Sequence, residues 1–139
     1  MKTLNSLLAH KLMALVRMDS KEKGQELADV LVAAGIKVIE ITLTTPGATK
    51  IIEKLAKNKD LTVGAGTVLT AKDVKKAESA GAKFIVSPDT NEDVIKASKK
   101  LGLISMPGVA TASEVAIALD SGADILKLFP ASTYGPSHL

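Results

Sequence analysis

One unit repeats along this chain of 139 residues: an apolar stretch that predicts a strand, then a loop, then a stretch that predicts a helix. We predict strands at 12–17, 38–43, 61–68, 84–88, 104–109 and 125–130, and helices at 4–10, 21–34, 48–57, 71–80, 92–101 and 113–120. The turns from helix to strand are similar, with a glycine at Gly35, Gly81, Gly102 and Gly122. A regular repeat of this kind, with buried parallel strands, predicts an α/β sheet, open or closed.

Local signals place the helix ends. Asp19 or Ser20 is a suitable N-cap for the helix at 21–34, and Gly35 is its stop. Thr70 caps the helix that follows it, and Ser113 is expected to open the helix that ends near residue 120.

Polar side chains gather where the predicted strands end. They are Arg17, Glu40 to Thr44, Thr67, Ser87 and Lys127 to Ser132. In a (β/α)₈ barrel the carboxyl ends of the strands form the active-site face, so we predict a barrel of the TIM (β/α)₈ type with about six βα units. A dinucleotide-binding sheet is less favoured, because Gly64-Ala65-Gly66 lacks the third glycine of that fingerprint.

Alternation along the stretch 38–43 shows which side chains face inward. Ile39, Ile41 and Leu43 form a wholly apolar set that suits a layer of helices, so the alternate residues, including Glu40, face the barrel interior. By the same rule Lys127 faces inward, within the apolar run that contains Ile125 and Leu128. An inward carboxylate and an inward lysine, at one end of a barrel, indicate a catalytic site.

Two structural explanations remain open for these charges. Lys127 can be an edge-strand lysine whose stem lies on apolar surface while its ammonium reaches water. Glu40 and Lys127 can instead form a buried ion pair, which is at best a weak stabiliser.

Composition excludes several other functions. With 2% aromatic residues and scattered lysines, the chain has neither stacking platforms nor a basic stripe for nucleic acid. It has no cysteine, which excludes disulfides and thiolate metal sites and fits a reducing cytoplasm. The first 16 residues are interrupted by Asn5, His10 and Lys11, so we predict neither a signal peptide nor a membrane span.

Five short segments together resemble one known family. They are Glu40-Ile-Thr-Leu43, Val63-Gly-Ala-Gly-Thr-Val68, Phe84-Ile-Val-Ser-Pro88, Met106-Pro-Gly-Val109 and Leu126-Lys-Leu-Phe-Pro-Ala131. In this order and spacing they resemble the 2-keto-3-deoxy-6-phosphogluconate / 4-hydroxy-2-oxoglutarate aldolases. The resemblance implies a cytoplasmic class I lyase of Entner–Doudoroff carbohydrate metabolism that forms pyruvate from a keto acid, without metal or cofactor, on a (β/α)₈ barrel that is commonly a homotrimer.

The resemblance also implies roles for individual residues. It makes Lys127 the Schiff-base lysine and Glu40 the general acid/base. The substrate-binding positions fall on Arg17, Thr67, Pro88 and Phe129. Thr67 is expected to bind the pyruvate carboxylate, and Phe129 to pack against the imine and exclude water.

General chemistry agrees with these roles. A neutral amine must attack the ketone, and an apolar strand beside the Arg17 cation is expected to favour the neutral form of Lys127. The iminium then withdraws electrons so that a carbon–carbon bond can break, while a carboxylate such as Glu40 moves protons.

The chain departs from the family pattern in two places. Thr44 stands where many members carry an arginine that can clamp a carboxylate, so Arg17, Thr67 and backbone amides must do more of that binding. Members also continue through two further βα units whose turns hold the substrate phosphate. We therefore expect residues 1–139 to form one barrel domain that is incomplete at its C-terminal end relative to the family.

Two alternatives to such an aldolase remain. One is a different lysine Schiff-base barrel, such as a dihydrodipicolinate-synthase-like lyase, although its motif is not found around Lys127. The other is a non-catalytic barrel fragment derived from an aldolase, with an incomplete site.

Overall fold

The computed structural model describes residues 2–139, in which helices and strands alternate along the chain. The first half contains α1 (Lys2–His10), β1 (Ala14–Val16), α2 (Lys21–Ala33), β2 (Val38–Thr42), α3 (Ala48–Leu55), β3 (Thr62–Gly66) and α4 (Ala71–Ser79). The second half contains β4 (Phe84–Val86), α5 (Glu92–Lys100), β5 (Ile104–Met106), β6 (Gly108–Val109), α6 (Ala112–Asp120), β7 (Lys127–Leu128), α7 (Ala131–Tyr134) and a 3₁₀ turn at Pro136–His138. No helix among these residues is long and apolar enough to cross a membrane.

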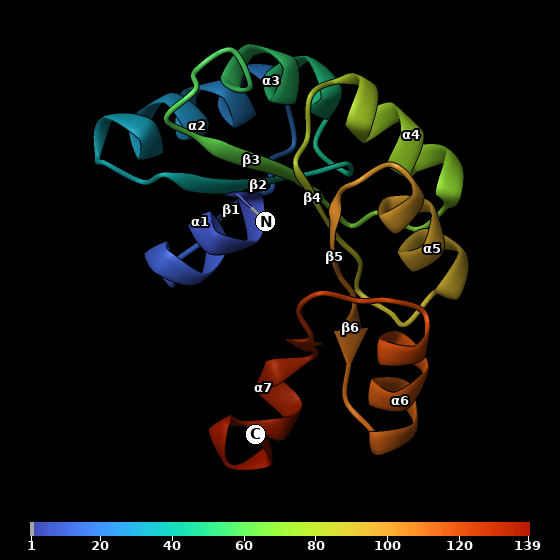
Figure 1. Cartoon of the computed structure of the whole chain (residues 1–139). Coiled ribbons are helices and arrows are strands. Elements are labelled where there is room, and N and C mark those ends of the chain that lie inside the picture. The colour runs from blue at the N-terminus through green and yellow to red at the C-terminus, as the bar shows by residue number, and fades with distance from the viewer. Residues whose placement is uncertain (1) are drawn as a thin grey trace.

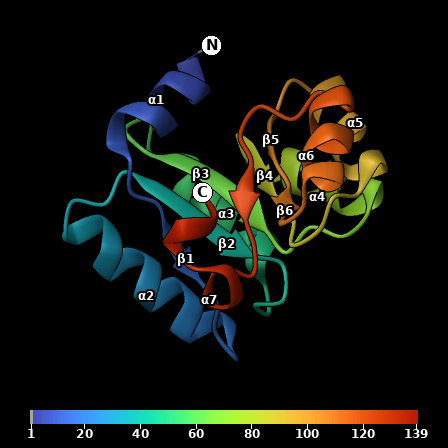
Figure 2. The ribbon, with the colours of Figure 1, turned by 90° about the horizontal axis from the view of Figure 1, so that it is seen from below.

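The strands form a parallel sheet in sequence order, β1-β2-β3-β4-β5, and a separate parallel pair, β6-β7. Helices α2 to α5 lie along the convex side of the curved sheet, and α6 continues this layer beside β6 (Figure 1). Seen from below, α2 lies near β1, at one end of the row of strands, and α4, α5 and α6 lie near β4, β5 and β6, at the other end (Figure 2). This arrangement confirms the predicted α/β fold of the (β/α)-barrel type.

The apolar residues form two layers, one on each face of the sheet. Ile39 and Ile41 pack in the outer layer with residues of the covering helices, such as Ile51 and Ile52. Val38 packs in the inner layer, whose other members include Phe84, Val86, Ile104 and Met106. The alternation expected for 38–43 is therefore confirmed, because neighbouring residues of one strand face opposite sides of the sheet.

Helix α1 covers the amino ends of β2 and β3. Leu7 of α1 belongs to the inner apolar layer, and the hydroxyl of Ser6 is hydrogen-bonded to that of Thr62 at 2.7 Å. The amino-terminal end of the interior is thus partly occupied, and the carboxyl ends of the strands are the free end.

Local signals explain most element boundaries, and three expectations need correction. Ser20 is the N-cap of α2, accepting from the amide of Lys23, and Gly35 follows that helix with φ +89°. The N-cap of α6 is Thr111, which with Glu114 forms a capping box, so Ser113 is the second helical residue and not the opening one.

The other two corrections concern strands. The stretch 104–109 is not one strand, because Pro107 lacks an amide hydrogen and separates β5 from β6. The stretch 125–130 contributes only Lys127–Leu128, since β7 pairs with the two-residue strand β6.

Candidate active site

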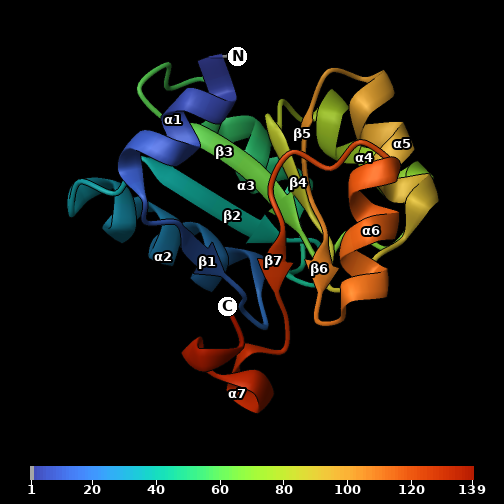
Figure 3. The same ribbon diagram turned by 60° about the horizontal axis from the view of Figure 1, so that its bottom comes forward.

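Most of the predicted site residues lie in, or directly after, strands β1, β2, β3 and β7, which are labelled in Figure 3. Arg17 follows β1, Glu40 is the third residue of β2, Thr67 follows β3, and Lys127 opens β7. β1, β2 and β3 are parallel neighbours in one sheet, which brings Arg17, Glu40 and Thr67 together. Lys127 comes from the separate β6–β7 pair and is close enough for its charge to act on the Glu40 carboxyl.

Glu40 is a buried carboxylate on the inner face of the sheet, with 2% of its surface exposed. It is paired in register with Gly64, and a Cβ added at Gly66 would overlap its carboxylate. Burial raises the pKa of the Glu40 carboxyl above its usual value, and the positive charges of Lys127 and Arg17 only partly offset this effect. Glu40 is therefore suited to hold a proton at a pH where an exposed carboxyl has lost it.

The lysine of β7 is half-buried and lies beside an aromatic ring. Its Nζ is 4.6 Å from the centroid of the Phe129 ring, and its backbone amide donates to the carbonyl of Pro107 at 2.9 Å. None of the salt bridges among residues 2–139 involves Lys127 or Glu40. The two groups interact through space without the direct contact that an ion pair would have.

Arg17 and Thr67 are joined across the end of β2. The Arg17 guanidinium donates from Nη2 to the Thr67 hydroxyl at 3.1 Å, and the two residues flank β2 because the strand order is β1-β2-β3. Thr67 has a backbone φ of +54°, which is uncommon for any residue other than glycine.

Pro88 is connected to the lysine strand through Gly108. The amide of Gly108 donates to the carbonyl of Ser87 at 3.0 Å, and a Cβ at Gly108 would overlap the Pro88 carbonyl. Gly108 is also the register partner of Lys127. The end of β4 is therefore packed directly against the strand pair that carries the lysine.

Sequence reasoning missed two glycines and a threonine cluster at this end of the barrel. Gly66 and Gly108 give room to Glu40 and Pro88, and a single sequence carries no signal for these contacts, because each joins residues from different strands or loops. The hydroxyl of Thr42, which is fully buried, donates to the carbonyl of Val16 and accepts from Thr44. The bond from Thr42 to Val16 connects the end of β2 to β1.

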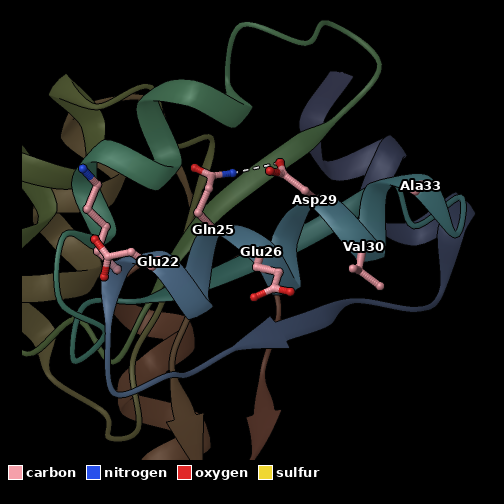
Figure 4. A pocket seen from close by; sticks show the side chains of 7 residues that line it. Glu22, Gln25, Glu26, Asp29, Val30 and Ala33 are labelled. Atoms are coloured by element: carbon pink, nitrogen blue, oxygen red, sulfur yellow. Dashed lines mark hydrogen bonds between the residues drawn. The ribbon is translucent and has the colours of Figure 1, made fainter.

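A large hollow lies elsewhere, on the outer face of α2 (Figure 4). It has a volume of about 590 Å³ and contains none of the predicted site residues. Its labelled side chains include Glu22, Glu26 and Asp29, and Gln25 donates to Asp29 at 2.9 Å. Among residues 2–139 no group of three or more histidine, aspartate or glutamate side chains is arranged to hold a metal ion.

The fold and this cluster define a (β/α)-barrel protein with an acidic and a basic side chain at the carboxyl ends of its strands. The model of the KDPG and KHG aldolase family matches residues 4–138, and the chain belongs to this family.

Similar proteins are bacterial aldolases. The 2-dehydro-3-deoxy-phosphogluconate aldolase of Zymomonas mobilis is 41% identical over 112 residues, which are 81% of this chain and 54% of that protein. A probable 2-dehydro-3-deoxy-6-phosphogalactonate aldolase of Rhizobium meliloti is 37% identical, over 91% of this chain and 60% of that protein. The chain thus spans a little over half the length of these relatives.

A solved structure agrees with the fold. The KDPG aldolase of Legionella pneumophila, with pyruvate captured as a covalent carbinolamine intermediate, superposes with a TM-score of 0.79 at 36% identity. That match covers 88% of this chain and 60% of the Legionella chain.

Proposed function

We propose that this chain carries the catalytic pair of a class I aldolase. The substrate is of the 2-keto-3-deoxy-6-phosphogluconate or 4-hydroxy-2-oxoglutarate type, and the products are pyruvate and an aldehyde. The observation that carries the proposal is the convergence of Lys127 and buried Glu40 at one end of the barrel, close enough for the lysine charge to act on the carboxyl. The covalent carbinolamine of the Legionella relative supports the same chemistry.

The reaction follows from these two groups. The neutral Nζ of Lys127 attacks the C2 carbonyl to give a carbinolamine, and loss of water gives an iminium. The C3–C4 bonding electrons then move toward the iminium nitrogen and leave an enamine, while the C4 hydroxyl loses its proton and becomes the aldehyde. Protonation of the enamine at C3 and hydrolysis release pyruvate and the free amine.

Glu40 serves the proton transfers. Because its pKa is raised, it can donate a proton to the departing water and, as the carboxylate, take the proton of the C4 hydroxyl. Both steps need one group that exchanges its proton near the working pH, and an exposed glutamate would stay ionised.

The remaining site residues surround the keto acid. Thr67 donates to the carboxylate, and Arg17 adds positive charge at the same end of the barrel. Phe129, whose ring lies beside the lysine Nζ, covers one side of the imine, and Pro88 lies against Gly108, next to the lysine strand.

The proposal extends to assembly and location. The chain is one (β/α)-barrel domain acting as a homo-oligomer, a trimer by analogy with the family, in the cytoplasm. The open backbone edge of β1 supports association, since β1 is the last strand on its side of the sheet and its Leu15 is 45% exposed. Light scattering measures the mass, and a monomer at all concentrations would contradict assembly.

A second candidate is a barrel fragment with the residues of the site but no turnover. It is favoured by the small β6–β7 pair, which leaves Lys127 only half-buried and Phe129 43% exposed. Such a chain would bind keto acids weakly or not at all.

Borohydride trapping separates the two candidates. The chain is mixed with pyruvate and borohydride, and peptide mass spectrometry is expected to find one reduced adduct, at Lys127. Lys127→Ala removes it, and Lys127→Arg does not restore it, because a guanidinium stays protonated. Lys76→Ala, on the surface of α4, is the control that keeps it. An adduct on a helix lysine, or none, contradicts the aldolase proposal.

A further inference from the structure

The hydrogen bond between Arg17 and Thr67 joins residues 50 positions apart in the chain. Arg17 is exposed at the end of β1, whereas Thr67 is half-buried at the end of β3. The bond therefore reaches over β2, the strand that carries Glu40. An exposed arginine held by a neutral hydroxyl, and not by a carboxylate, needs an explanation other than charge pairing.

The direction of this bond is fixed by chemistry. A guanidinium has only N–H donors, so the Thr67 oxygen must be the acceptor. A threonine hydroxyl has one hydrogen of its own, and among residues 2–139 no hydrogen bond uses that of Thr67. In contrast, the buried hydroxyl of Thr42 donates to the carbonyl of Val16, and that of Thr44 donates to Thr42. The Thr67 hydrogen is free to reach a ligand.

The backbone conformation of Thr67 indicates that the surrounding structure holds this residue in place. Its φ of +54° lies in the left-handed region, where β-branched residues are rarely found. Strained residues of this kind are often held at binding sites by the surrounding structure. The preceding Gly66 adds a constraint, because it must leave room for the Glu40 carboxylate.

We propose that Arg17 is a positioning residue that acts through Thr67. By occupying the acceptor side of the Thr67 hydroxyl, it turns the hydroxyl hydrogen toward the carboxylate of a keto acid held at Lys127. Arg17 thereby sets the preference for 2-keto acids over simple ketones without itself binding the carboxylate. This inference rests on the proposed Schiff-base function and deepens its account of substrate recognition.

A double-mutant cycle on the full chain tests the inference. The variants are Thr67→Val, which keeps the shape but loses the hydroxyl, Arg17→Met, and the two combined. The readout is the pyruvate concentration that gives half-maximal borohydride adduct, with acetone as a ketone that lacks a carboxylate. Thr67→Ser tests rescue by a second hydroxyl, Lys23→Met controls for loss of a nearby surface cation, and thermal melts report folding.

The expected result is strong coupling between the two residues. Thr67→Val raises the half-maximal pyruvate concentration about 10- to 100-fold, the usual effect of losing one hydrogen bond to a charged group. Arg17→Met raises it in the parent chain but not in the Thr67→Val background. Thr67→Ser stays near the parent, Lys23→Met has no effect, and acetone labelling is unchanged in Thr67→Val. Acetone labelling in Arg17→Met measures the effect of the lost charge on Lys127 itself, and the pyruvate result is expressed relative to it.

Other outcomes overturn the inference. If the Arg17→Met loss persists in full beside Thr67→Val, Arg17 binds the carboxylate directly or through its general field. If acetone labelling falls equally, the pair is only structural.

The same cycle read by saturation-transfer NMR with pyruvate alone does not depend on imine formation. An absent adduct with coupled pyruvate binding contradicts the proposed Schiff base but supports the positioning role. Additive losses, or no binding of pyruvate at all, contradict the positioning role.

Discussion

The sheet β1–β5 and the pair β6–β7 differ in how completely they are enclosed. All five residues of β2 are buried, between helices on one face and the inner apolar layer on the other. Both residues of β7 are half-buried, and Phe129 just after it is 43% exposed. The proposed acid/base lies in the enclosed region and the proposed nucleophile in the open one. The environment of Glu40 is therefore dominated by buried protein neighbours, whereas that of Lys127 depends more on solvent.

The largest effect is expected when the proposed acid/base group of the enclosed region is removed. Glu40→Gln is expected to slow exchange of the pyruvate methyl protons with deuterium by about 10²- to 10⁴-fold, the usual contribution of general acid/base help. Proton NMR follows this exchange, which passes through the enamine and needs no second substrate. Glu53→Gln, an exposed carboxylate of α3 paired with Lys50, is the control. Full exchange activity in Glu40→Gln would make Glu40 a structural residue.

Matched deletions in the two regions compare their packing. Ile41→Ala, at a fully buried position of β2, is expected to cost about 2–5 kcal/mol of unfolding free energy, because the rigid sheet leaves a cavity. Ile125→Ala, at a half-buried position before β7, is expected to cost roughly 1–2 kcal/mol, since less apolar area is lost. Urea unfolding measures both. Equal losses would show that the open region is packed as tightly as the sheet.

The unpaired side of β1 provides a test of the open edges. Leu15→Lys is expected to lower the average mass measured by light scattering, because a charge on an edge strand disfavours pairing with another chain. Leu119→Lys adds the same charge at an exposed position of α6 away from the β1 edge, and is expected to leave the mass unchanged. A mass that falls equally in both variants would attribute association to general surface hydrophobicity.

The smallest effect is the pH dependence that Glu40 gives to stability. In the unfolded chain this carboxyl releases its proton near the ordinary value of about 4.5, whereas in the folded protein its raised pKa retains the proton to higher pH. The folded state thus binds more protons between these values, so its stability falls as the pH rises through this window. Relative to Glu40→Gln, the parent chain should lose stability from about pH 4.5 upward, as thermal melts over a pH series would show. A constant difference between the two proteins would contradict the raised pKa.

Much of the fold could be predicted because its signals are local. Caps such as Ser20 and stops such as Gly35 determine helix ends within a few residues, and alternation assigned Glu40 to the interior. The break at Pro107 was missed because an apolar run hides the missing amide hydrogen. The packing of the Glu40 carboxylate against Gly66 and the left-handed backbone of Thr67 arise from contacts between strands, which a single sequence does not reveal.

The absence of a side chain at Gly66 has a consequence for engineering. The Glu40 carboxylate occupies the space where a Cβ of residue 66 would lie, so the methyl group added by Gly66→Ala would displace that carboxylate. A carboxylate displaced toward water would regain ordinary acidity, because the low-polarity surroundings that now retain its proton would be lost. The pKa of Glu40 can therefore be tuned through the side-chain volume at position 66, on a neighbouring strand, without altering any ionisable group.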